Sequence, residues 1–439
     1  MYASRITHLS KHRQRGAAFI VMLVIMIMGV AAFLVSSLNS SAVQIRRDQV
    51  NTEVMAQAKE ALIGYAASVN LTTGSKRPGD LPCPDTNNDG IAELSCGNAS
   101  GTTGQALRIG RLPWLTLGLP DLRDSSGERL WYAVSNNFKN NTKTTCSAAG
   151  QPGCLNSDSA GTITVRSPNG NILFDASLGN GVVAIIISPG DVLQRTDQPA
   201  PQDRSSGGIN NPQNYLDIAL GEDNATFVDG ATDGFIQGRV KDINGNVILN
   251  DQMIVITQDN IMQALQKRVA GEVRQCLSEY ANPANSGIGL YPWAAPTIGP
   301  SYIDTSGTLF GRIPDTPFGD TLGDNGSMNN TWVGNCNILS SSGWWLNWKE
   351  QVFFGMSDYY SPDQNTGAPL LTVTPPSLVA NKQFVVIVAG KMLPGQVRSL
   401  NSDKSIPNNY LEGQNSVMGT TLFIQSSPSA TFNDTVGFQ

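Results

Sequence analysis

Residues 13–38 read RQRGAAFIVMLVIMIMGVAAFLVSSL. From Ala17 to Leu38 this stretch contains no charged residue and no proline. A helix of about 22 residues is about 33 Å long, and the hydrocarbon core of a bilayer is about 30 Å thick. The sequence therefore predicts a membrane-spanning helix over residues 17–38.

The segment in front of this stretch is basic and contains no acidic residue. Positive residues stay on the cytoplasmic side of a membrane, so everything after Leu38 is expected outside. The expected location is the inner membrane, crossed once with the head in the periplasm, or the cell surface once a filament has assembled. A secretory signal peptide has a shorter apolar run of about 7–15 residues, whereas a plain signal anchor is compatible with this length. The basic residues are Arg5, Lys11, Arg13 and Arg15.

The junction RQRG-AAFIVMLV resembles the processing site of type IV prepilins, with Gly16 between a basic leader and an apolar run. The resemblance implies that a prepilin peptidase cuts the bond between Gly16 and Ala17 and that Ala17 is then N-methylated. Residues 1–16 would be the leader, and the partners would be the peptidase, the inner membrane and other pilin or pseudopilin subunits.

Two positions depart from the prepilin pattern. The first residue of the mature chain is Ala17, where prepilins usually have Phe or Met, and the fifth is Val21, where they usually have Glu. In this respect the chain resembles the K-type minor pseudopilins of type II secretion and some minor pilins, which initiate or cap a filament. This resemblance favours a place at or near a filament tip.

The helix is expected to continue beyond the apolar stretch. No proline occurs between Leu38 and Pro78, and apolar residues recur there at mostly helical spacing. We therefore expect one helix over 17–69, with a transmembrane first half and an amphipathic second half. In pilins, the second half of such a helix packs on a sheet.

The remainder of the chain shows an internal repeat. Landmarks of the first half return in the same order in the second half, which predicts two related lobes, residues 50–250 and 251–439. Each lobe is expected to be a helix on an antiparallel sheet, so the fold class is α+β. The paired landmarks are Tyr65 with Tyr280, Arg111 with Arg312, Val182 with Val385, Tyr215 with Tyr410, and Phe227 with Phe423.

Local patterns predict particular elements in the lobes. The Val- and Ile-rich runs 182–187 and 384–389 are typical of buried central strands. Residues 258–280 are amphipathic and predict a helix of the second lobe. Residues 190–213 are rich in Pro, Gly and polar residues and predict a loop, with a counterpart at 390–408.

The chain has six cysteines, an even number that favours disulfides in an exported protein. Six cysteines allow fifteen connectivities. Sequence proximity favours Cys83–Cys96 and Cys146–Cys154, which leaves Cys276–Cys336. A zinc site is the alternative, but the spacing is irregular and the mature chain would have no histidine.

The histidine content argues against catalysis. The chain has two histidines, His8 and His12, and both lie in the leader. A mature chain without histidine has no Ser-His-Asp or Cys-His mechanism, and we find neither a paired-acid motif nor a phosphate-binding glycine loop. We expect no enzymatic activity, and the net charge of −6 argues against nucleic acid as a partner.

Residues 85–93, DTNNDGIAE, predict a calcium loop. Oxygen ligands at alternate positions followed by glycine are typical of short Ca²⁺-binding loops. The alternative is a turn in which Asp and Asn bind their own backbone. The similar sequence DINGN at 242–246 is expected to form a hairpin turn. The predicted ligands are Asp85, Asn87, Asp89, the Ile91 carbonyl and Glu93.

The tryptophans Trp344, Trp345 and Trp348 could form a sugar-stacking platform, but their alternation with other apolar residues favours a place in the core. As a whole, the sequence predicts a minor pilin or pseudopilin of a type IV pilus or type II secretion-like filament, for assembly initiation or surface contact. The alternative is a signal-anchored envelope protein with a ligand-binding head that never assembles.

Overall fold

The structure, a computed structural model, consists of two units, Met1–Glu53 and Val54–Gln439. For residues 15–21, 29–41 and 230–233 it describes the backbone alone. The residues that the structure describes are 15–71, 76–97, 104–139, 154–205, 207–227, 230–298, 302–317, 328–336, 338, 343–374 and 378–439.

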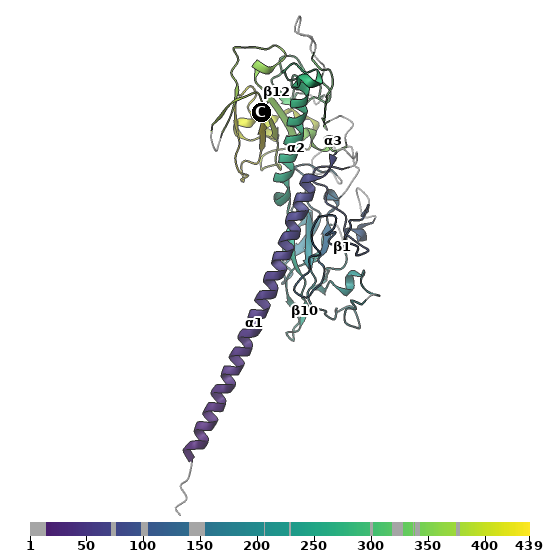
Figure 1. Cartoon of the computed structure of the whole chain (residues 1–439), viewed down its shortest axis with the longest axis vertical. Helices are drawn as coiled ribbons and strands as arrows, with labels where there is room; N and C mark the ends of the chain where they lie inside the picture. The colour runs from purple at the N-terminus through teal and green to yellow at the C-terminus, as the bar shows by residue number, and fades with distance from the viewer. Residues whose placement is uncertain are drawn as a thin grey trace, which may run out of the picture. The chain divides into compact units, whose positions relative to one another are not determined.

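Helix α1 runs from Arg15 to Ser68, 54 residues without a break, and is drawn in purple in Figure 1. One continuous helix over nearly the expected range is therefore present. Most other helical segments are single turns, and the rest of the chain consists of short strands in small sheets.

The prediction of a membrane-spanning segment is wrong. Among the described residues, no helix is both long enough and apolar enough to cross a bilayer. The expected fold class, which began with a membrane-spanning pilin-like helix, and the single-pass inner-membrane location are corrected accordingly. The apolar run of α1 whose side chains are described is Met22–Met28.

The first sheet is four-stranded, in the order β1-β2-β5-β11, and every neighbouring pair is antiparallel. Its central strands are apolar and fully buried, as the run 182–187 predicts. Strand β11 belongs to this sheet although it lies just before α2 in the chain. The strands are β1 (Ile109–Arg111), β2 (Trp131–Val134), β5 (Ala184–Ser188) and β11 (Gln252–Ile256).

The second sheet has the corresponding order, β12-β13-β16-β18, and is again antiparallel throughout. Helix α2, Gln258–Ala281, precedes it and confirms the helix predicted over 258–280. The side chain of Thr257 accepts a bond from the Asn260 N–H and caps its first turn. The strands are β12 (Phe310–Arg312), β13 (Val352–Met356), β16 (Phe384–Val388) and β18 (Thr435–Phe438).

Each half of the head also has a three-stranded sheet, in the orders β4-β3-β8 and β15-β14-β17. In both, the central strand pairs antiparallel with one neighbour and parallel with the other. The strands are β3 (Ile163–Arg166), β4 (Ile172–Phe174), β8 (Gly230–Ile236), β14 (Leu371–Thr374), β15 (Val379–Lys382) and β17 (Leu422–Ile424).

Two further pairs of short strands complete the sheets, β6-β7 and β9-β10. The second pair flanks residues 242–246, so the hairpin expected at DINGN is confirmed. The elements are β6 (Ile218–Ala219), β7 (Glu222–Asp223), β9 (Val240–Lys241), β10 (Val247–Leu249) and the one-turn helix α3 (Trp345–Trp348).

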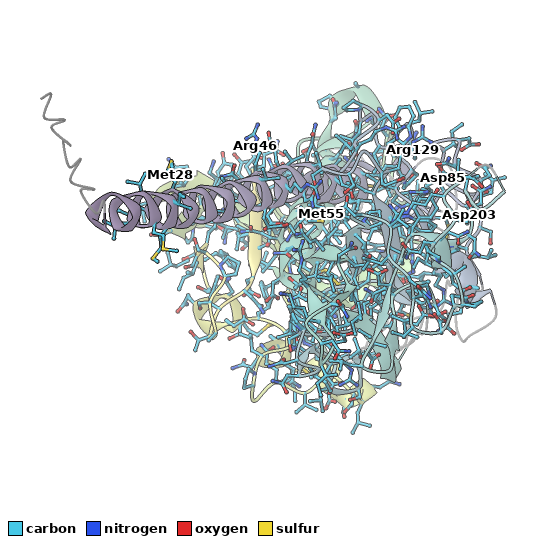
Figure 2. The ribbon with its side chains drawn as sticks, turned by 90° about the horizontal axis from the view of Figure 1, so that it is seen from below. Met28, Arg46, Met55, Asp85, Arg129 and Asp203 are labelled. Atoms are coloured by element: carbon cyan, nitrogen blue, oxygen red, sulfur yellow. A yellow bond between two sulfur atoms is a disulfide. The ribbon has the colours of Figure 1, made fainter. Side chains whose placement is uncertain are left out.

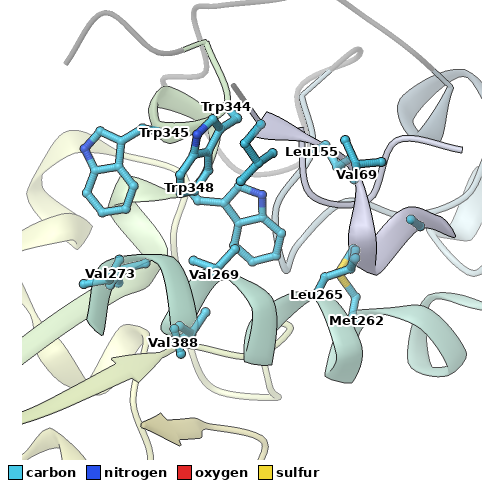
Figure 3. Packing of buried hydrophobic residues seen from close by; sticks show 14 of the residues in the cluster. Val69, Leu155, Met262, Leu265, Val269, Val273, Trp344, Trp345, Trp348 and Val388 are labelled. Atoms are coloured by element: carbon cyan, nitrogen blue, oxygen red, sulfur yellow. The ribbon is translucent and has the colours of Figure 1, made fainter. Parts of the chain in front are cut away.

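One hydrophobic core covers a face of both four-stranded sheets. The buried face of α1 meets Tyr132 and Ile186 of the first sheet, and α2 meets Phe354 and Val386 of the second, all within one cluster. Figure 3 shows Trp344, Trp345 and Trp348 beside Val269 and Val273 of α2. The α1 residues in this core are Met55, Ala58, Leu62 and Ala66.

The strand registers align the two halves of the head. Arg111 lies opposite Trp131, and Arg312 lies opposite Phe353, so these arginines correspond as predicted. On the next strand, Ile187 lies opposite Trp131 and Ile387 lies opposite Phe353. Two residues earlier on these strands, Ile185 therefore corresponds to Val385. The predicted pairing of Val182 with Val385 is therefore wrong by three residues, because a run of Val and Ile offers no landmark that fixes its register.

Candidate functional site

The N-terminal part of α1 presents apolar side chains to solvent on every side. Met22–Met28 are all exposed, from 45% for Val24 to 72% for Met22. Successive residues of a helix point about 100° apart, so a run of this length leaves no polar face. Further along, Val43 and Ile45 are exposed as well. A helix that is apolar all round requires cover from something other than water.

The predicted processing junction lies at the start of this helix. Gly16 and Ala17 fall in the first turn of α1, where the structure describes the backbone alone. Residues 1–14, which include His8 and His12, lie outside the described residues. Processing at Gly16 and methylation of Ala17 therefore stay predictions.

The loop at 85–93 is closed by hydrogen bonds to its own backbone. Asp85 is buried, and its carboxylate accepts bonds from the N–H groups of Asn87, Asn88 and Gly90 at 3.1, 2.6 and 2.6 Å. The Glu93 carboxylate accepts from the Thr86 N–H at 3.2 Å and from its hydroxyl at 2.7 Å. These are the bonds of an Asx-type turn.

Neighbouring side chains hold this loop in place. Arg129 donates to both the carbonyl and the side-chain oxygen of Asn88, each at 2.8 Å, and Figure 2 labels Asp85 and Arg129. Gly90 has a φ of +84°, and a Cβ there would lie 2.7 Å from the Trp114 ring. Glycine is therefore required both by the left-handed backbone and by the close ring.

The ligands predicted for calcium are brought together in one loop but do not converge. Asn87 and Asp89 each accept an N–H two residues on, Asp89 and Ile91 respectively. Within the described residues no group of three or more His, Cys, Asp or Glu could hold a metal ion. Desolvation raises the pKa of Asp85, while its bonds from Gly90 and Asn88 lower it. Calcium at this loop stays a prediction.

The disulfides Cys83–Cys96 and Cys276–Cys336 are confirmed. Cys154 is also disulfide-bonded, and Cys146 lies outside the described residues. The tryptophans are buried, with Trp345 and Trp348 fully inaccessible, so their place in the core is confirmed.

The sequence did not reveal two equivalent polar clusters, one in each half of the head. In the first, the guanidinium groups of Arg111 and Arg204 lie 3.9 and 5.0 Å from the ring centre of Tyr215. In the second, Arg312 and Arg398 lie 4.4 and 4.6 Å from the ring centre of Tyr410. The first polar cluster comprises Arg111, Gln202, Arg204, Tyr215, Asp217, Asn224 and Asp251, and the second Arg312, Gln396, Arg398, Tyr410, Glu412, Asn415 and Asp434.

The loop arginines of the two clusters bind equivalent backbone groups. Arg204 donates to the carbonyls of Gly190 and Asn214 at 2.7 and 3.0 Å. Arg398 donates to those of Gly390 and Asn409 at 2.9 and 2.6 Å. These bonds fix the loops predicted at 190–213 and 390–408 on their sheets. Two sequence signals mark the clusters: the paired Arg111 and Arg312, and the repeated NYL of residues 214–216 and 409–411.

Comparisons of this chain with protein-family models, with curated proteins and with solved structures gave no match in any of the three.

Proposed function

We propose that this protein is a minor pilin or pseudopilin, a subunit of a type IV pilus or type II secretion-like filament. In this proposal the N-terminal part of α1 packs against the equivalent helices of other subunits. The observation that carries it is the run Met22–Met28, in which every side chain is apolar and exposed.

The energetics favour several neighbours around this helix. Burying a large apolar side chain contributes about 1.5–3 kcal/mol, so the run Met22–Met28 contributes on the order of 10 kcal/mol when covered on all sides. Association costs about 4–15 kcal/mol in lost freedom. One neighbouring helix would cover a single stripe of the run, whereas a bundle of neighbours covers all of it.

The head supports a subunit present in few copies. Residues from Val54 to Gln439 form one compact unit, and one of its hydrophobic clusters includes residues of both four-stranded sheets. A head of this size is too bulky to repeat easily along a thin filament. The place at or near a filament tip rests on Val21, which stands where most prepilins have a glutamate.

The first test is the intact mass of the protein from hosts with and without an active prepilin peptidase. We expect the loss of residues 1–16 and the gain of one methyl group at Ala17, only where the peptidase is active. A chain that keeps its leader in both hosts contradicts the proposal.

The second test is photo-crosslinking in a host that assembles filaments. A photoreactive amino acid at Ile25, 61% exposed on α1, should yield crosslinks to other filament subunits. The matched control is the same amino acid at Leu178 in the head, 80% exposed. Equal crosslinking at both positions, or none at Ile25, counts against packing through α1.

A further inference from the structure

Each half of the head contains a pair of buried carboxyl groups. In the first half, the backbone N–H of Asp217 and the side-chain amide of Asn224 donate to Oδ2 of Asp251 at 2.9 and 2.8 Å. Asp217 in turn accepts from Gln202 at 3.0 Å and from the Asn250 N–H at 2.8 Å. Oδ1 of Asp251 is buried and has no partner among the described residues.

The second half repeats this arrangement. The Glu412 N–H and the Asn415 amide each donate to Oδ2 of Asp434 at 3.0 Å. Glu412 accepts from Gln396 at 2.9 Å and from the Asn433 N–H at 3.0 Å. Oδ1 of Asp434 is also buried without a partner in the part of the chain that the structure describes. The bare oxygen thus recurs at the corresponding residue of each half.

A neutral, protonated carboxyl is compatible with an oxygen that has no partner at a much lower cost than a carboxylate. An ionised carboxylate with a buried, unsatisfied oxygen beside a second carboxylate is strongly disfavoured. Desolvation, and then the nearby carboxylate, raise the pKa of Asp251 and of Asp434 well above the ordinary value. Desolvation raises the pKa of Asp217 to about 6.

The arginines around these pairs also bind other groups. Arg204 and Arg195 lower the pKa of Asp217, but less than burial raises it. Arg195 also forms ion pairs with Asp197 and Asp223 at 2.9 and 3.0 Å. In the second half, Arg398 pairs with Asp158 at 2.9 Å, and Lys267 of α2 lines the same surface cavity of about 410 Å³ as Asp434.

We propose that each pair, Asp217 with Asp251 and Glu412 with Asp434, holds a proton at neutral pH, so that the folded head is a proton-binding protein stabilised by mild acid. Asn224 and Asn415, which donate to the two aspartates, also donate to the carbonyls of Ile236 in β8 and Ile424 in β17. Asp251 and Asp434 directly precede the edge strands β11 and β18. Loss of the proton therefore loosens the contact between the two sheets of each half.

The direction of the pH effect follows from proton linkage. These folded-state pKa values lie above those of the unfolded chain, so the stabilisation is fully present below about pH 4. It declines as the pH rises through the folded-state pKa values. The melting temperature of the full chain should fall between about pH 5 and about pH 8.

The test compares the variants Asp251→Asn, Asp434→Asn and the double variant with the parent chain in full pH series of unfolding. Asparagine keeps an acceptor oxygen for the existing bonds and cannot ionise. We expect each single variant to lower the number of protons taken up on folding near pH 7 by about one, and the double variant by about two. Asp363→Asn, at an exposed position, is the matched control and should leave proton uptake unchanged.

Infrared spectroscopy of the unmodified chain gives a measurement that is independent of the stability of any variant. At neutral pH we expect the carbonyl band of protonated carboxyl groups, reduced in each variant and smallest in the double variant. Absence of that band in the parent chain, or a double variant with the same proton uptake as the parent, would overturn the proposal. The result of this test does not depend on the proposed filament function, because leader processing and subunit contacts concern α1 and the carboxyl pairs lie in the head.

Discussion

The two polar clusters have the same internal bonds and different surroundings. In the first, Arg204 lies 3.4 Å from Glu128, whose side chain is 27% exposed. In the second, Arg398 lies 2.9 Å from Asp158, and both side chains are nearly inaccessible, at 1% and 5%. Asp158 comes from the first half of the head, so this ion pair joins the two halves.

Among the described residues, the segment 155–158 makes most of the polar contacts across this junction. The Leu155 N–H donates to Asn347 at 2.9 Å, the Ser157 hydroxyl to the Ala389 carbonyl at 2.5 Å, and Asp158 accepts from Gln351 at 2.9 Å. Bonds within each cluster are duplicated because each half needs them to attach its loop. Bonds at the junction are found once because they join unlike partners.

The sharpest test of this difference is the pair of variants Arg398→Ala and Arg204→Ala. Removing Arg398 leaves Asp158 buried with its charge, which typically costs about 3–5 kcal/mol. Removing Arg204 breaks a weaker ion pair whose partner is partly solvated, and it should cost about 1–2 kcal/mol. Denaturant unfolding of both variants measures the difference, and equal losses would show that the junction adds nothing.

The disulfides offer a second comparison between the halves. Cys276–Cys336 closes a separation of 60 residues and Cys83–Cys96 one of 13. Loop-closure entropy predicts losses of about 4 and about 3 kcal/mol when each pair is replaced by serines. Thermal unfolding under non-reducing conditions checks the order. A larger loss from the shorter loop would mean that the loop at 85–93 depends on its bridge for more than chain entropy.

The smallest expected effects compare two Asx turns. Asp85→Ala removes three backbone bonds from a buried carboxylate and should cost about 1–2 kcal/mol. Asp242→Ala, in the exposed hairpin turn, should lower the melting temperature much less. The melting temperatures of both variants and of the parent chain are measured with Ca²⁺ and with a chelator. This measurement distinguishes a turn from a metal site at residues 85–93. A parent chain that melts at a higher temperature with Ca²⁺ than with a chelator supports the calcium prediction, and equal melting temperatures support the turn.

Local patterns predicted several elements because the residues involved act through their own neighbours in the chain. The proline-free segment after Leu38 and its helical spacing predicted the length of α1, and Val- and Ile-rich runs predicted the buried strands β5 and β16. The membrane-spanning assignment went wrong because it relied on the length of an uncharged run, whereas no helix of the described residues is both long enough and apolar enough to cross a bilayer.

The polar clusters were beyond local patterns. Asp217 and Asp251 are 34 residues apart, and Glu412 and Asp434 are 22 apart. In sequence each resembles an ordinary turn residue among Asn and Gly. Their burial and shared donors follow from sheet packing, which no spacing rule captures. The pairing of Tyr215 with Tyr410 was the nearest approach from the sequence, since both rings contact the arginines of their clusters.

Local sequence patterns were enough to predict the long helix, the buried strand runs, the helix over Gln258–Ala281, and the disulfides Cys83–Cys96 and Cys276–Cys336. These depend on periodicity and proximity along the chain. Only the tertiary structure decided the registers that align the two halves, the closure of the Asp85 loop on its own backbone, and the two buried carboxyl pairs. The physical reason is that burial and hydrogen bonding act through space, and they bring together groups that are distant in the sequence.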